Sequence, residues 1–193
     1  MDYFENIIKR VVEEDGYWVR QSFKVNLTKK EKRAIGKPTI PRPEIDIVGY
    51  RANTNELLVL EVKSFLDSVG VRFKELAENF EIPTGRYKMF TCKKYREVVF
   101  KRLVSDLVEK QLILPEPKLS FGLAAGNIFI KEQEQLKTFF KAKSWVLYTP
   151  QMITKAIEKL AHIPYENDPY VISSKIMMKN KLGKRYSKLG KRI

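Results

Sequence analysis

Apolar positions recur at helical spacing at the start of the chain and then change to an alternating pattern. In segment 2–14 the apolar residues fall at i, i+3, i+4, i+7 and i+8, the stripe of an amphipathic helix: Phe4, Ile7, Ile8, Val11 and Val12. Asp2 suits the N-cap of this helix, and Gly16 suits its end. Residues 17–25 alternate loosely and are rich in Tyr, Trp, Val and Phe, which predicts a first strand.

Two further runs of strand-forming residues, 43–48 and 57–63, predict a β-hairpin. The turn cluster 52–55, Ala-Asn-Thr-Asn, separates the two runs. The preceding segment, 26–43, is polar and strongly basic. It contains three prolines: Pro38, Pro41 and Pro43. Because proline cannot donate a backbone hydrogen bond, this segment is expected to be a loop without regular structure.

The second half of the chain predicts helices at 93–112, 132–142 and 150–161, and strands at 119–125 and 145–148. Segment 66–91 shows no clear period. The order αβββαβ over residues 2–125, followed by αβα, predicts an α/β fold with a mixed central sheet flanked by helices. We expect one domain over residues 1–170 and a basic C-terminal tail over residues 171–193.

The hairpin carries three charged residues that its apolar pattern does not require. Glu61 and Lys63 share one face of the second strand, because side chains alternate with a period of two. Asp46 lies in the facing strand. Ionised groups are costly to bury unless they pair or bind a metal. An acid facing Glu-x-Lys suits a divalent-metal phosphodiesterase, although Glu61 and Lys63 could instead form an ordinary ion pair, with Asp46 ending an edge strand.

Asp46, followed fifteen positions later by Glu61-Val62-Lys63, resembles the PD-(D/E)XK nuclease superfamily. The region over residues 1–130 is also similar to archaeal Holliday-junction resolvases and to the nuclease domains of restriction systems. The resemblance implies a restriction-endonuclease-like core of order αβββαβ. It also implies hydrolysis of DNA phosphodiester bonds with Mg²⁺ or Mn²⁺ as cofactor.

The resemblance assigns a role to each member of the motif. Asp46 and Glu61 are expected to bind the metal, with the backbone carbonyl of Val62 as a third ligand, since hard divalent ions prefer oxygen. Lys63 is expected to orient or deprotonate the attacking water, or to stabilise charge on the phosphate.

Two further acids leave alternatives open. Glu44 directly follows Pro43 and shares the strand face of Asp46, so either acid could be the ligand; the deeper position and the spacing from Glu61 favour Asp46. Glu5 matches the glutamate that family members often add from the first helix. It could equally complete a capping box with Asp2.

The net charge of +14, from 37 Lys and Arg against 23 Asp and Glu, predicts a polyanionic partner, with DNA favoured over RNA. General solubility or association with ribosomes is the alternative explanation. The basic residues expected to contact DNA phosphates lie in the 26–43 loop, before the long helix and in the tail: Lys29, Lys30, Arg33, Lys37, Arg42, Arg86, Lys184 and Arg185. Like-charge runs of this kind suit flexible arms.

A single histidine and a single cysteine exclude several mechanisms. Cys92 and His162 cannot assemble a zinc finger, and they leave no paired-histidine nuclease site or disulfide framework. His162 falls at a predicted helix end, where a capping role is the default. The sequence shows no secretory signal and no apolar run long enough for a membrane span, so a cytoplasmic protein without membrane contact is expected.

The sequence therefore favours a Mg²⁺-dependent nuclease acting on DNA, with endonuclease action preferred. One alternative is a DNA-binding module whose nuclease fold no longer cuts. Another is an RNA-cleaving or tRNA-processing enzyme on the same fold. Met177, Met178 and the aromatic residues of 139–148 are expected in the core or in contacts of a possible homodimer.

Overall fold

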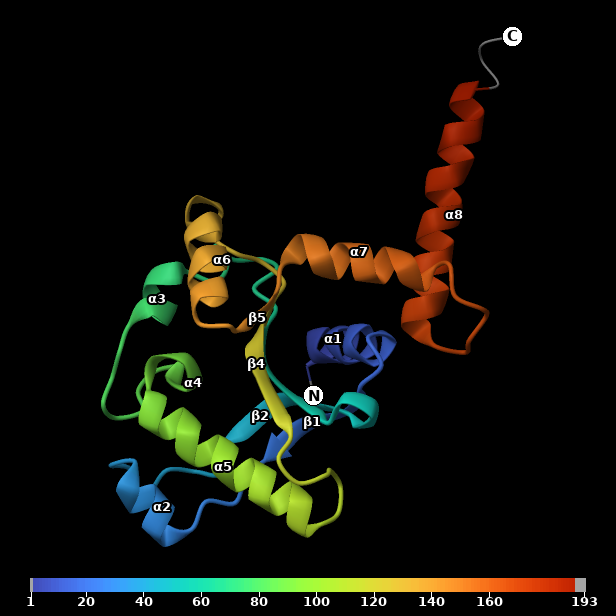
Figure 1. The fold of residues 1–193 in the computed structure, drawn as a ribbon. Coiled ribbons are helices and arrows are strands. Elements are labelled where there is room, and N and C mark those ends of the chain that lie inside the picture. Colours follow the sequence, from blue (N-terminus) through green and yellow to red (C-terminus); the bar gives the residue numbers. More distant parts are fainter. Residues whose placement is uncertain (1, 190–193) are drawn as a thin grey trace. The chain divides into compact units, whose positions relative to one another are not determined.

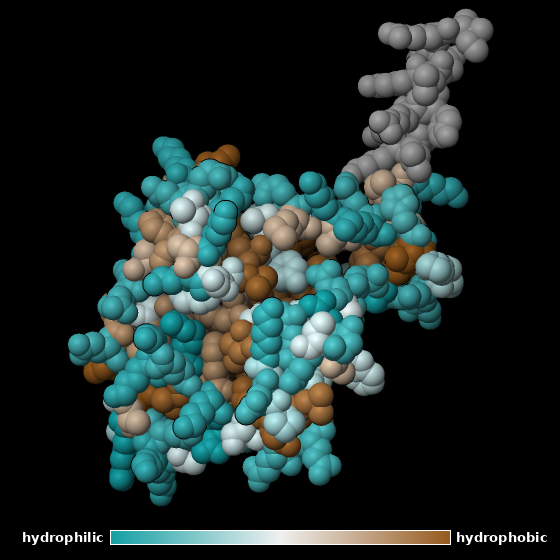
Figure 2. Space-filling view, in the orientation of Figure 1, coloured by the Kyte–Doolittle hydropathy of each residue, from teal (hydrophilic) through white to brown (hydrophobic). Residues whose placement is uncertain are grey.

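The computed structural model describes the backbone of residues 2–189 and the side chains of residues 2–179. The chain divides into two compact units, Met1–Thr149 and Pro150–Ile193, which are described separately below. The boundary expected at residue 170 falls inside the second unit. Hydrophilic side chains cover much of the face shown in Figure 2, as expected for a chain in which 31% of residues are charged.

A five-stranded mixed sheet forms the centre of the first unit (Figure 1). In spatial order its strands are β1 (Trp18–Lys24), β2 (Glu44–Arg51), β3 (Glu56–Lys63), β4 (Lys118–Ala125) and β5 (Val146–Tyr148). The first three strands pair antiparallel, whereas β3, β4 and β5 pair parallel. The predicted mixed sheet flanked by helices is confirmed, and so is the hairpin that joins β2 to β3.

Helix α1 (Tyr3–Glu14) packs on the sheet with its predicted apolar stripe. Phe4, Ile8, Val11 and Val12 are buried, and the helix contacts β1, β2 and β3. The Asp2 side chain accepts the Phe4 N–H at 2.9 Å, which confirms Asp2 as the N-cap. The helix thus begins at the end of the hairpin that carries the charged residues.

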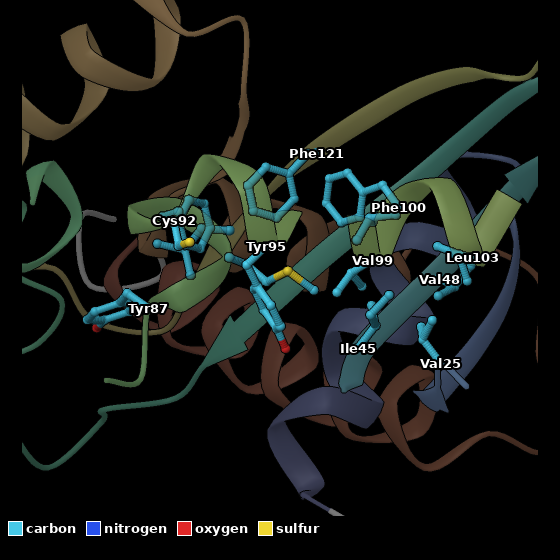
Figure 3. Close-up of a cluster of buried hydrophobic side chains, with 14 of the residues drawn as sticks. Val25, Ile45, Val48, Tyr87, Cys92, Tyr95, Val99, Phe100, Leu103 and Phe121 are labelled. Atoms are coloured by element: carbon cyan, nitrogen blue, oxygen red, sulfur yellow. The ribbon is translucent and has the colours of Figure 1, made fainter. Parts of the chain in front are cut away.

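The opposite face of the sheet is covered by α5 (Lys93–Glu109), which confirms the predicted long helix (Figure 1). Val99 and Leu103 of α5 share one buried cluster with Leu57, Val59 and Phe121 of the sheet. Figure 3 shows Val99, Leu103 and Phe121 in this cluster. The alternate residues of β3, Leu58 and Leu60, are also buried but do not belong to this cluster, so they lie on the other face of the sheet. The period of two in β3 therefore places Glu61 and Lys63 on the α5 face.

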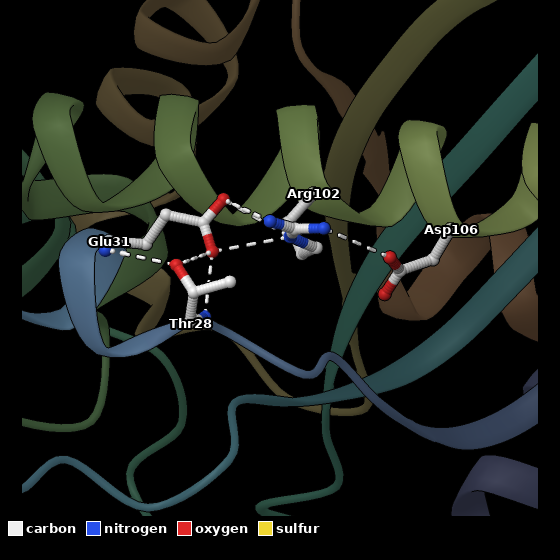
Figure 4. A network of polar contacts seen from close by, with 4 residues as sticks. All are labelled: Thr28, Glu31, Arg102 and Asp106. Atoms are coloured by element: carbon white, nitrogen blue, oxygen red, sulfur yellow. Dashed lines mark hydrogen bonds and ion pairs between the residues drawn. The ribbon is translucent and has the colours of Figure 1, made fainter.

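Segment 26–43 is not the irregular loop that its prolines predict, because it contains helix α2 (Lys29–Ala34). Thr28 and Glu31 form a capping box in which each side chain accepts the other residue's backbone N–H. Glu31 also accepts hydrogen bonds from Arg102 of α5, with Nη2 2.9 Å from Oε1 (Figure 4). The prolines all follow the end of α2, so they do not interrupt it.

The segment that shows no clear period in the sequence contains two short helices, α3 (Phe73–Ala77) and α4 (Lys88–Thr91). Helix α6 (Gln133–Ala142) then precedes β5 and packs near α3. Helices of four or five residues complete barely one turn. No apolar period can be recognised over so short a distance, which explains why the sequence did not reveal them.

The second unit contains α7 (Pro150–Leu160) and α8 (Pro169–Leu189), which pack on each other. The Lys175 ammonium donates hydrogen bonds to the carbonyls of Ala161 and Ile163 after the end of α7. The basic tail is thus helical as far as Leu189, not a flexible arm. No helix in the described part of the chain is long and apolar enough to cross a membrane.

Candidate active site

The central sheet divides between β2 and β3 at the point where the charged residues lie. Pairing of β2 with β3 stops at Ile47 and Leu60, whereas β1 stays paired with β2 as far as Glu44. On the other side, β3 stays paired with β4 as far as Lys63. From Asp46 to Glu44 the strand β2 is therefore no longer paired with β3, and we call this unpaired stretch between the two strands the opening of the sheet.

Asp46 is the first residue of β2 beyond this division. Its carboxylate Oδ2 accepts the backbone N–H of Val62 at 2.7 Å, in place of the strand-to-strand hydrogen bond that has ended. The side chain is 19% exposed, so it is largely buried yet open to solvent. The edge of the opening is thus formed by a carboxylate that is fixed to the neighbouring strand.

The Lys63 ammonium lies among three oxygen-bearing groups. Its Nζ is 2.6 Å from Glu61 Oε1, 3.1 Å from the Val62 carbonyl oxygen and 3.8 Å from Asp46 Oδ2. Glu61 and Lys63 are 16% and 20% exposed, respectively. The structure therefore brings together Asp46, Glu61, Val62 and Lys63, which are four of the five residues of the predicted site.

Burial and mutual charge shift the pKa values of all three ionisable groups. Burial raises the pKa of the Glu61 and Asp46 carboxyls, and the nearby Lys63 ammonium only partly offsets this. Burial by itself would lower the pKa of Lys63, but Glu61 and Asp46 raise it above its ordinary value. Lys63 therefore stays positively charged at neutral pH.

Glu5, in the first turn of α1, lies close enough to Asp46 and Lys63 for the charges to affect one another. Its Oε2 is buried and has no hydrogen-bond partner among the described residues. Burial, followed by the charges of Asp46 and Asp2, raises the pKa of Glu5 to about 7. The capping box with Asp2 does not form, since the Asp2 side chain accepts the Phe4 N–H alone. Glu5 is thus electrostatically part of the site.

Among the described residues Glu44 forms no ion pair with Lys63, although its charge helps to raise the pKa of Asp46 and of Glu5. It is exposed, and its carboxylate is 3.8 Å from the ammonium of Lys24 on the neighbouring strand. Of the two acids that the sequence left open, Asp46 is the one beside Lys63.

The available donors suit a hard divalent cation. Within the described part of the chain, no three side chains of His, Cys, Asp and Glu lie close enough to hold a metal. Two carboxylates and one backbone carbonyl nevertheless converge on the single point that the Lys63 ammonium now takes. The Glu5 carboxyl, whose buried Oε2 has no hydrogen-bond partner among the described residues, is a further oxygen-bearing group near the site. An all-oxygen set completed by water matches Mg²⁺ or Mn²⁺ better than Zn²⁺.

The cations predicted to contact DNA occupy three places. Lys29, Lys30, Arg33, Lys37 and Arg42 are exposed on α2 and on the segment that follows it. Arg86 is exposed in the loop before α4, with its guanidinium 5.9 Å from the centre of the Phe65 ring. Lys184 and Arg185 belong to α8, and their side chains lie outside the described residues.

Lys88 is a charged neighbour of the site that the sequence did not identify as a site residue. It lies two residues after Arg86 at the start of α4. Its positive charge partly offsets the rise that burial causes in the pKa of Glu61. The Glu61 charge in turn contributes to raising the pKa of the buried Tyr87 and Tyr95 hydroxyls. The basic and aromatic residues of segment 85–88 were the only sign in the sequence that this segment could bind DNA. That the segment lies near Glu61 follows from the fold and could not be predicted.

Comparisons with known proteins add little to this geometry. No protein-family model matches the sequence, and no curated protein matches it significantly. Among solved structures, the chain is similar to the crystal structure of an XisH family protein from Nostoc punctiforme PCC 73102. The two are 12% identical, with 79% of this chain and 94% of that chain covered and a TM-score of 0.34. A TM-score this low establishes no shared fold, so the function proposed below rests on the site alone.

Proposed function

We propose that this protein is a divalent-metal-dependent nuclease with a restriction-endonuclease-like core of the PD-(D/E)XK type, which hydrolyses phosphodiester bonds within DNA. The observation that carries the proposal is the Lys63 ammonium held between Glu61, Asp46 and the Val62 carbonyl at the division of the sheet. A phosphodiesterase site needs converging oxygen ligands and a fixed cation, and both are present here.

A purely structural role explains the cluster less well. An ordinary ion pair would account for Glu61 and Lys63, but it requires neither Asp46 nor the opening of the sheet beside it. Partly buried charges lower stability unless they are compensated. The Lys63 ammonium has two carboxyls within 4 Å, and Glu5 is close enough to help raise its pKa. Three carboxyls with raised pKa values beside one partly exposed ammonium are typical of a functional site.

Asp46, Glu61 and the Val62 carbonyl would hold the metal. A bound Mg²⁺ would lower the pKa of a water molecule and would neutralise the charge that develops on the phosphate. Without a metal, Glu61 and Asp46 raise the pKa of Lys63, so its ammonium is a positive charge that would face the phosphate oxygens. Glu5, with a pKa of about 7, can hold a proton on its buried oxygen near neutral pH.

Electrostatics favour a nucleic acid as the substrate. The net charge of +14 attracts a polyanion, and Arg86 and Lys88 lie on the segment that faces Glu61. Cations beside the carboxylates allow a phosphodiester to approach an otherwise acidic site. Nothing in the described residues closes the site around a strand end, and endonuclease action is therefore the form proposed.

The test is cleavage of plasmid, linear and single-stranded DNA with and without Mg²⁺ or Mn²⁺, comparing wild type with Lys63→Ala. Lys24→Ala is the matched control, because it removes an ion pair with Glu44 in the same sheet away from the cluster. We expect metal-dependent cleavage by wild type and by Lys24→Ala, and none by Lys63→Ala. DNA binding without cleavage would indicate a non-catalytic module, and cleavage restricted to RNA would indicate an RNA-processing enzyme.

A further inference from the structure

Two loops that follow the parallel strands β3 and β4 form one wall beside the site. The loops span residues 64–72 and 126–130. Val71 donates its N–H to the Asn127 carbonyl at 3.0 Å, and Phe129 donates its N–H to the Val71 carbonyl at 2.9 Å. Gly126 donates its N–H to the carbonyl of Lys63 itself at 2.8 Å. The wall is thus joined by hydrogen bonds to the residue at the centre of the site.

Close backbone packing holds the two loops in place. A Cβ at Gly70, which has a φ of +88°, would stand 2.8 Å from the backbone of Asn127. The Asn127 side chain in turn donates a hydrogen bond to the Ser68 carbonyl at 2.7 Å. The tip of the first loop is therefore a supported structure.

This supported tip exposes apolar side chains to solvent. The Ser68 N–H bonds the Phe65 carbonyl, so Leu66 and Asp67 are the corner residues of a tight turn. Leu66 is 64% exposed, and Val69 just after the turn is 58% exposed. Large apolar side chains grouped beside a site are typical of a binding surface.

The start of α1 adjoins this turn. The Phe4 ring and the Leu66 side chain both lie next to Gly126, within about 3 Å of where a Cβ would stand there. Tyr3 directly precedes Phe4 and is 84% exposed. We call Tyr3, Leu66 and Val69 the apolar rim.

Two arginines lie over aromatic rings of these loops, Arg72 from the end of the first loop and Arg86 from the segment before α4. The Arg86 guanidinium lies over the Phe65 ring, and the Arg72 guanidinium lies 4.8 Å from the centre of the Phe129 ring. Among the described residues, neither arginine forms an ion pair with an acid. The exposed Asp67 carboxylate at the turn repels phosphates from the tip. Phosphates therefore suit the flanks of the wall, and uncharged base faces suit its tip.

We propose that the apolar rim binds DNA bases that are unstacked next to the scissile phosphate. This proposal rests on the proposed nuclease function. The preferred substrate is then DNA with unpaired or displaced bases near the cut. A continuous duplex covers its base faces by stacking, so it offers aromatic and aliphatic side chains little to contact. Single strands and distorted steps expose those faces, and proteins bind them by combining cationic grooves with aromatic platforms or apolar wedges.

The test measures binding without divalent ions, so it does not depend on cleavage. Fluorescence anisotropy compares a labelled duplex with the same duplex carrying a central unpaired stretch. Wild type should bind the second DNA more tightly, by roughly fivefold or more, as loss of a stacked base implies. Leu66→Ser and Tyr3→Ala should lose most of this preference. Leu114→Ser is the matched control, because Leu114 is 56% exposed before the opposite end of β4.

The outcomes separate the two proposals. Equal affinity of wild type for both DNAs, or an unchanged preference in Leu66→Ser and Tyr3→Ala, would overturn the role of the apolar rim. A parallel cleavage assay with Mg²⁺ tests hydrolysis by itself. A preference that depends on the apolar rim without any cleavage would support the rim and overturn the nuclease function. Cleavage without such a preference would support the nuclease function and overturn the role of the apolar rim.

Discussion

The Asp46 carboxylate accepts the Val62 backbone N–H at 2.7 Å at the position where the β2–β3 ladder ends. One side chain therefore serves two purposes, since it satisfies a buried backbone donor and adds negative charge beside Lys63. The two purposes can be separated by substitution, because asparagine can accept the same hydrogen bond without carrying the charge.

We expect Asp46→Asn to abolish metal-dependent cleavage while keeping a free energy of unfolding close to that of wild type. Asp46→Ala should lose cleavage too, and should be less stable than Asp46→Asn by about 1–3 kcal/mol, because the Val62 N–H is left unpaired in a buried position. Urea unfolding of the two variants measures this difference. Equal stability of both variants would show that the hydrogen bond contributes nothing.

Divalent ions should stabilise the folded protein. An ion that binds only the native state adds about 1.4 kcal/mol at ten times its dissociation constant. Thermal unfolding should therefore shift to higher temperature with Mg²⁺ or Mn²⁺, and Glu61→Gln should lose the shift. Glu44→Gln is the control, because Glu44 is exposed and lies away from Lys63. A shift of equal size in wild type and Glu61→Gln would place the ion elsewhere.

Glu5 should make stability fall as pH rises in the absence of divalent ions. Its pKa is about 7 in the folded protein against an ordinary 4.5, so between these values the native state binds more protons than the unfolded state. Its contribution to stability is therefore complete below about pH 4.5 and is lost as pH rises through 7.

Glu5→Gln tests this directly, because glutamine imitates the protonated carboxyl at every pH. We expect the variant to match wild type at pH 4 and to exceed it at pH 8, by on the order of 1 kcal/mol after solvent screening. Urea unfolding at the two pH values measures the difference. A variant that is less stable than wild type at pH 8 would contradict the assignment.

Substitutions of lysine and arginine in α8 and in α2 test which of these two basic helices binds DNA phosphates. If α8 lies along DNA, the double substitution Lys184→Ala, Arg185→Ala should flatten the dependence of log affinity on log salt by about 0.9 for each phosphate that is no longer neutralised. Lys29→Ala, Lys30→Ala provides the same comparison for α2. Binding titrations at several salt concentrations decide between them, and an unchanged slope means that the substituted segment does not bind phosphates.

Sequence patterns were sufficient for the elements whose apolar period extends over several turns or a whole strand. The stripe of α1, the run of β3 and the buried side of α5 each repeat often enough to define the element and the face that it buries. Helix α2 was missed because a capping box and an ion pair to Arg102 stabilise it, and none of its residues is buried.

The candidate site was only partly predictable for a related reason. Asp46, Glu61 and Lys63 follow from strand periodicity and spacing. The choice between Asp46 and Glu44, however, depends on where β2 and β3 separate, which is a long-range property of the sheet. The absent capping box at Glu5 and the proximity of Lys88 to Glu61 likewise depend on how α1 and α4 pack, which no local pattern encodes.

The rate of Mg²⁺-dependent plasmid cleavage by wild type and by Glu61→Gln tests the central claim most directly. Glutamine retains the shape of the side chain but removes the charge that faces Lys63 and the proposed metal position. We expect wild type to cut the plasmid and Glu61→Gln to be slower by roughly a hundredfold or more, with unchanged DNA binding. Cleavage by Glu61→Gln at the wild-type rate, or no cleavage by wild type with either Mg²⁺ or Mn²⁺, would contradict the proposed nuclease function.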